Sequence, residues 1–135
     1  MKRLILTILL VAALTAFFTS CSKDESLDGQ TWGSESFTGQ LVPPNYKCVI
    51  TLNFTESQVN ATINWKEADD DDDTGESCTA KGTYTYDKKE VKIKVVNDIE
   101  AIDETWSGKV DKKTMTLDVV MHVWGVGEQV KFTKQ

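Results

Sequence analysis

The acidic run over 67–76 is the stretch of the sequence whose residue types best match a ligand-binding site, because carboxylate oxygens in a turn can bind calcium. Asp70 and Asp72 precede a Thr-Gly pair with the spacing that opens an EF-hand loop. The twelfth position would be Lys81, where such a loop needs a bidentate glutamate, and no flanking helices are expected. The run is therefore interpreted as a solvated hairpin loop, mobile over 69–73 and without structural calcium. Asp70 and Asp72 are weak candidates for divalent binding.

Catalytic chemistry finds no support in the sequence. His122 is the only histidine, and it has the solvent-facing parity of its expected strand. No Gly-x-Ser-x-Gly elbow is present, and the carboxylates that cluster in the acidic loop lie where burial cannot raise a pKa for acid catalysis. We expect a surface histidine, no catalytic residue, no cofactor and no enzymatic activity. A hydrolase that uses His122 is the least supported alternative.

The first 20 residues have the organisation of a bacterial lipoprotein signal peptide. A short basic start precedes an uncharged apolar run over 4–18, which is shorter than the roughly 20 residues of a membrane-spanning helix. The tetrapeptide Phe-Thr-Ser-Cys over 18–21 resembles a lipobox, whose cysteine receives acyl chains such as palmitate and becomes the new N-terminus. Cys21 is therefore the predicted lipidation site. Ordinary cleavage, with Cys21 as a spare disulfide partner, is the alternative.

Residues 21–29 are predicted to be the lipidated cysteine and a flexible tether. The segment Ser-Lys-Asp-Glu-Ser over 22–26 is polar and cannot pack into a core. It resembles the short acidic export signal that sends lipoproteins of the Bacteroidetes group to the cell surface. We expect a lipid anchor in the outer membrane, with the protein either surface-exposed or facing the periplasm.

The two remaining cysteines are Cys48 and Cys78, an even pair in an oxidising compartment. This arithmetic predicts a disulfide between them, with two buried thiols as the alternative. Beyond the leader, 15 − 2 = 13 basic groups face 21 acidic ones, which gives 13 − 21 = −8, and no arginine remains. This balance excludes nucleic-acid binding, which needs basic patches and favours arginine.

From residue 30 onward, apolar and polar residues alternate with a period of two, which is typical of antiparallel strands with one buried face. Short turns separate the runs, and an Asp-Lys-Lys turn occurs twice. Residues 30–135 are therefore predicted to form an all-β domain, an eight-stranded antiparallel up-and-down barrel, with an open β-sandwich as the alternative. The expected strands cover 32–38, 46–54, 59–66, 78–86, 91–95, 105–110, 115–122 and 130–133.

Three segments carry a resemblance to a known family. Leu-Asp-Gly-Gln-Thr-Trp over 27–32 opens the first strand, Gly-Thr-Tyr-Thr-Tyr over 82–86 precedes a turn, and Val-Lys-Phe-Thr-Lys over 130–134 ends the chain. Together they resemble the lipocalin-like lipoproteins of Bacteroidetes. The resemblance implies a calycin-type barrel in which Trp32 closes the base, although two residues instead of one separate Gly29 from this tryptophan.

Most aromatic residues share the inward parity of the expected strands. A barrel of eight strands is just wide enough to be filled by side chains or to hold one small ligand. We expect a non-catalytic, monomeric barrel, anchored to the membrane through its lipid, that binds a small apolar or amphipathic ligand near Trp65, Trp106 and Tyr84. The alternative is a protein-interaction or inhibitor module with a filled core, which acts through its loops.

Overall fold

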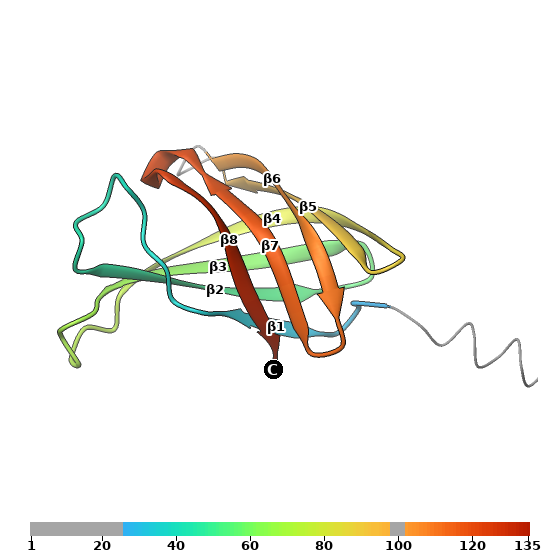
Figure 1. Cartoon of the computed structure of the whole chain (residues 1–135), viewed down its shortest axis with the longest axis horizontal. Helices are drawn as coiled ribbons and strands as arrows, with labels where there is room; N and C mark the ends of the chain where they lie inside the picture. The colour runs from blue at the N-terminus through green and yellow to red at the C-terminus, as the bar shows by residue number, and fades with distance from the viewer. Residues whose placement is uncertain (1–25, 98–101) are drawn as a thin grey trace, which may run out of the picture.

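The computed structural model describes residues 26–97 and 102–135, so the predicted signal peptide and the predicted lipidation site Cys21 lie outside the described part. Eight strands form one closed barrel in which each strand pairs antiparallel with the next and the last pairs with the first (Figure 1). Closure confirms the predicted barrel and excludes the open sandwich. The strands are β1 (Thr31–Ser34), β2 (Tyr46–Phe54), β3 (Gln58–Glu67), β4 (Glu76–Asp87), β5 (Glu90–Asn97), β6 (Ile102–Asp111), β7 (Thr114–Met121) and β8 (Val126–Lys134).

Period-two alternation explains why these segments are strands. In β5, Val91, Ile93 and Val95 are buried, whereas the lysines between them are exposed. The buried apolar side chains of all eight strands meet in a single core cluster. Full burial of one such aliphatic side chain contributes about 1.5–3 kcal/mol, so a register slip by one residue would lose the core. No helix among the described residues is long and apolar enough to cross a membrane.

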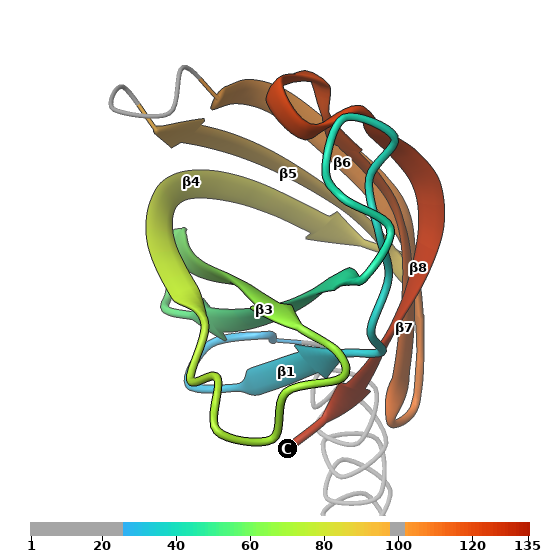
Figure 2. The same ribbon diagram turned by 90° about the vertical axis from the view of Figure 1, so that its left-hand side faces the viewer.

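The two ends of the barrel differ. At one end, called the base here, tight turns join β2 to β3, β4 to β5 and β6 to β7. The β4–β5 turn places Lys88 and Lys89 at φ values of 50° and 68°, the twist that suits a two-residue hairpin. At the other end, called the mouth, longer connections join β1 to β2 and β3 to β4. A 3₁₀ turn, η1 (His122–Trp124), lies there between β7 and β8 (Figure 2).

The base is closed by side chains from the start of the domain. Trp32 is 1 % exposed, and its Nε1 donates a hydrogen bond to Oε1 of Gln30 at 3.1 Å. Leu27, which was predicted to belong to the flexible tether, is also buried in the core. The backbone N–H of Gly29 donates to the carbonyl of Phe54 at 2.9 Å. The packed domain therefore begins at least three residues earlier than predicted.

The predicted disulfide between Cys48 and Cys78 is not formed, so the prediction from the even number of cysteines is wrong. Cys48 lies opposite Trp65 in the β2–β3 pair, and Cys78 lies opposite Ile63 in the β3–β4 pair. Strand β3 thus separates the two cysteines. Next-but-one strands are about 9–10 Å apart, whereas a disulfide needs Cα atoms within about 7 Å. Burial, together with the nearby Cys78, raises the pKa of the Cys48 thiol, which favours its protonated form.

Candidate ligand-binding site at the barrel mouth

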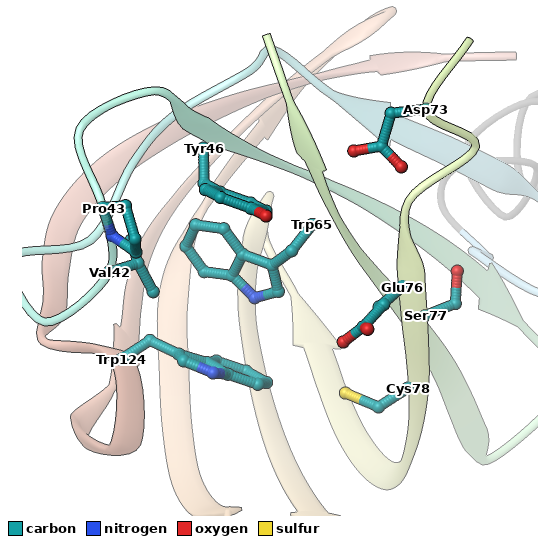
Figure 3. Close-up of a pocket in the computed structure, with 9 residues that line it drawn as sticks. All are labelled: Val42, Pro43, Tyr46, Trp65, Asp73, Glu76, Ser77, Cys78 and Trp124. Carbon is teal, nitrogen blue, oxygen red and sulfur yellow. The ribbon is translucent and has the colours of Figure 1, made fainter. Parts of the chain in front are cut away.

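A hollow of about 490 Å³ opens at the mouth, within the range of small-molecule sites in proteins (Figure 3). Three separate stretches of the chain supply its wall: the β1–β2 loop, the β3–β4 hairpin and η1. The lining side chains are Val42, Pro43, Tyr46, Trp65, Asp73, Glu76, Ser77, Cys78 and Trp124. Two larger hollows lie on the outer surface, but neither contains an aromatic side chain among its lining residues.

Two backbone hydrogen bonds join the β1–β2 loop to the β7–β8 connection, and this contact forms one wall of the hollow. The backbone N–H of Gln40 donates to the carbonyl of Gly125, and that of Leu41 donates to the carbonyl of Trp124, each at 3.1 Å. The backbones approach so closely at Gly39 that a Cβ atom there would collide with the Trp124 carbonyl oxygen. A glycine is therefore required at this crossing. The loop in turn brings Val42 and Pro43 beside Trp124.

Aromatic rings form the apolar part of the hollow. The Trp65 and Trp124 ring centroids are 5.5 Å apart, with their planes inclined at 57°. Phe37, which is buried in the core, meets Trp65 edge-to-face with the ring centroids 6.3 Å apart. Such tilted and edge-to-face pairs are the favoured geometries of aromatic rings. Phe37 thus supports the Trp65 ring from within the core.

The indole nitrogen of Trp65 has no hydrogen-bond partner among the described residues, although the nitrogen is buried. The whole side chain is only 8 % exposed. Figure 3 shows this nitrogen directed into the hollow, on the side where Trp124 and Glu76 lie. A buried donor without an acceptor costs about 1–3 kcal/mol, so most buried polar groups are paired. Trp65 therefore presents an unused hydrogen-bond donor to whatever occupies the hollow.

Two carboxylates of the β3–β4 hairpin lie beside Trp65 on the same side of the hollow. Glu76 lies directly across from Trp65 in the β3–β4 register, so both side chains share the inward face. The carboxylate of Asp73 accepts hydrogen bonds from the backbone N–H of Glu67 at 2.7 Å and of Gly75 at 2.9 Å. These two bonds, that from Glu67 first, lower the pKa of Asp73 below its ordinary value. Backbone hydrogen bonds therefore fix the position of the Asp73 carboxylate at the hollow.

The acidic loop is joined to its flanking strands at Asp73, while its mobility over 69–73 stays a prediction. Gly75 has a φ of +80°, and a Cβ atom there would meet the side chain of Asn64 and the backbone of Trp65. The Asn64 side chain donates to Oγ of Ser77 at 2.8 Å. Five adjacent aspartates look equivalent in the sequence, but Asp73 differs from the others because it bonds two backbone N–H groups.

Asp70 and Asp72, the weak metal candidates, are both exposed, and Asp72 donates its backbone N–H to Oδ1 of Asp70 at 3.0 Å. Within residues 26–97 and 102–135, no group of three metal-ligating side chains comes together. The absence of structural calcium stays a prediction. Nothing in the geometry adds to the case for a metal.

Of the three side chains expected to bind a ligand, only Trp65 lines the hollow. Trp106 is completely buried in the middle of β6, and its Nε1 donates to the carbonyl of Val120 at 2.7 Å. Tyr84 lies near the base, where its hydroxyl donates to the carbonyl of Thr55 at 2.6 Å. Its ring meets Phe54 edge-to-face at 4.9 Å. Trp106 was placed at the mouth because its strand was expected to begin only one residue earlier, at 105.

The sequence did not identify Tyr46, Trp124 and Glu76 as site residues. Extending the alternation of β4 by one step before Cys78 would have placed Glu76 on the inward face. Tyr46 had inward parity at the start of its strand, which the same reasoning could have assigned to the mouth. Trp124 carries no such signal, because it lies in the 3₁₀ turn outside any strand.

His122 lies at the rim of the barrel with its side chain 82 % exposed, in accord with its expected surface position. Its Nδ1 is 2.7 Å from Oε1 of Glu104, which also accepts the backbone N–H of His122 at 3.2 Å. This contact fixes the start of the 3₁₀ turn that carries Trp124. His122 is not among the residues that line the hollow.

Comparison of the chain with protein-family models, with curated proteins and with solved structures finds no match.

Proposed function

We propose that this protein is a lipid-anchored, non-catalytic binding protein of the bacterial cell envelope, which holds a small amphipathic ligand at the mouth of its barrel. The signal-peptide pattern and Cys21 support the anchor. The buried, unpartnered Nε1 of Trp65, directed into a hollow of about 490 Å³, is the single observation that carries the binding function. Aromatic walls with a few polar groups are typical of small-molecule sites.

The geometry favours an amphipathic ligand over a wholly apolar one. The rings of Tyr46, Trp65 and Trp124 can cover an apolar body, whereas Glu76 and Asp73 supply carboxylates at the edge of the hollow. A ligand that was apolar throughout would leave the buried Trp65 donor without a polar partner, which is unfavourable, and it would use neither carboxylate. The ligand therefore needs an apolar and a polar part.

A protein partner is the second candidate, because two apolar side chains beside the mouth are exposed. Leu41 is 71 % exposed in the β1–β2 loop, and Val123 is 44 % exposed in η1. A partner that covers these side chains would bind the loops. This matches the alternative predicted from the sequence, a protein-interaction or inhibitor module. The two functions differ in whether the binding depends on the interior wall of the hollow.

The test uses N-phenylnaphthylamine, a neutral aromatic amine that becomes fluorescent in apolar surroundings. Trp124→Ala enlarges the hollow and removes a ring, and we expect it to weaken probe binding by about tenfold or more. Val123→Ala is the matched control, because it changes the adjacent residue outside the hollow and should leave the affinity unchanged. Thermal unfolding followed by circular dichroism checks that both variants fold. Absence of saturable binding to the folded wild type would contradict the ligand-binding proposal.

A further inference from the structure

The hollow combines a carboxylate with the faces of aromatic rings. Glu76 has the parity of the inward-facing positions of β4, which apolar or small residues otherwise occupy, but it lies at the very start of the strand and its side chain is exposed at the edge of the hollow. No basic side chain lies within salt-bridge distance of Glu76 in the described part of the chain, where the one such pair is His122 with Glu104. An unpaired carboxylate in a partly enclosed site favours a positive charge beside it.

The surroundings of the mouth strengthen this preference. The β3–β4 connection carries the five aspartates over 69–73 between Glu67 and Glu76, and Lys66 precedes it as its nearest basic residue in the chain. Several carboxylates around a cleft give it a negative potential that attracts cations and raises their rate of association. Trp and Tyr rings bind cations over their faces within about 6 Å of the ring centroid, tryptophan best. The same hollow presents Tyr46, Trp65 and Trp124.

A cation alone would leave one group unsatisfied. The Nε1–H of Trp65 is a donor and needs an acceptor, which a bare ammonium group lacks. Because Trp65 and Glu76 are direct cross-strand neighbours, the acceptor must lie close to the positive charge in the same ligand.

We propose that the ligand is a small organic cation with an apolar chain and a carbonyl, ester or hydroxyl oxygen next to its positive group. The cation lies between Glu76 and the indole faces, and the oxygen accepts the Trp65 N–H. This inference rests on the proposed function, because it names the ligand class of the same hollow.

The test compares three probes of similar size on the folded, lipid-free domain by titration calorimetry at low salt. Hexanoylcholine carries the cation and an ester oxygen. Its neutral isostere has a quaternary carbon in place of the nitrogen, and nonyltrimethylammonium has the cation without the oxygen. We expect hexanoylcholine to bind about tenfold more tightly than the neutral isostere and about three- to tenfold more tightly than nonyltrimethylammonium.

Two variants assign these preferences to residues. Glu76→Gln should abolish most of the preference for the cation, whereas the control Glu90→Gln at the base should keep it. Trp65→Phe retains a ring without the N–H, and it should bring the affinity for hexanoylcholine down to that for nonyltrimethylammonium. Circular dichroism confirms that each variant is folded.

The outcomes separate this inference from the proposed function. If the neutral isostere binds as tightly as hexanoylcholine while N-phenylnaphthylamine still binds in a Trp124-dependent way, the cation is wrong and the binding function stands. A cation preference that survives Glu76→Gln would also overturn the inference, because the charge would be recognised elsewhere. If no probe binds the folded wild type, both the inference and the proposed function are wrong.

Discussion

The indole nitrogens of three of the four tryptophans have different roles. Those of Trp32 and Trp106 donate to Gln30 and to the carbonyl of Val120, and both rings are buried. The nitrogen of Trp65 is buried as well but has no partner among the described residues. The same residue type thus serves the core at two positions and is available to a ligand at a third.

We expect Trp106→Phe to destabilise the protein by about 1–3 kcal/mol more than Trp65→Phe. Removal of the Trp106 indole leaves the Val120 carbonyl unsatisfied, whereas removal of the Trp65 indole eliminates a donor that had no acceptor. Urea unfolding followed by far-ultraviolet circular dichroism measures both free energies of unfolding. Equal losses in the two variants would contradict the assignment of an idle donor to Trp65.

Asp73 gives a prediction for the pH dependence of stability. Its pKa is lowered in the folded protein, so the ionised carboxylate stabilises the fold at pH values above its unfolded pKa of about 4. This contribution is lost as the pH falls below about 4 and through the lowered folded pKa. Asp73→Asn should therefore lower the Tm at neutral pH, and the difference from wild type should shrink in acid.

The matched control is Asp71→Asn, because Asp71 is an exposed neighbour in the same loop. Its substitution should leave the Tm nearly unchanged at every pH, and a chelator should do the same to the wild type. If Asp71→Asn lowered the Tm as much as Asp73→Asn does, the effect would come from the net charge of the loop and not from the two backbone hydrogen bonds.

At the scale of elements, the mouth depends on the crossing of two connections. Gly39→Ala should push the β1–β2 loop away from Trp124, because the new Cβ meets the Trp124 carbonyl oxygen. Fluorescence titration should then show weaker binding of N-phenylnaphthylamine, by about tenfold if the hydrogen bonds of Gln40 and Leu41 are lost with it. Gly127→Ala is the control, since a Cβ there meets nothing within 4 Å. Unchanged binding in Gly39→Ala would show that the fastened loop does not shape the site.

The strands were predictable because each carries its own signal, as the alternation of Val91, Ile93 and Val95 illustrates. The site was less predictable, because Trp124 reaches it through a 3₁₀ turn and a loop crossing that depend on the folded barrel. The disulfide prediction was wrong for a reason that follows from the predicted strand order. An up-and-down order places a third strand between Cys48 and Cys78.

At the scale of the whole molecule, the proposed anchor is tested at Cys21, which lies outside the described residues. Cys21→Ala should abolish acylation, since the thiol is the acceptor of the lipid, and the protein should move from the membrane fraction to the soluble fraction. Fractionation of cells and mass spectrometry of the mature N-terminus measure the two effects. A Cys21→Ala variant that stays fully with the membrane would show that the apolar run over 4–18 is itself the anchor.

The entry of the chain at the base sets how a lipidated protein would be oriented. Leu27 is buried and Gly29 bonds Phe54 at the end opposite the mouth. A fully extended stretch from Cys21 to Ser26 reaches at most about 18 Å, whereas β4 alone is about 40 Å long. With its lipid in the bilayer, the barrel would stand on its base, and the mouth would face away from the membrane. Its ligand would then arrive from the aqueous side and not by lateral diffusion from the lipid.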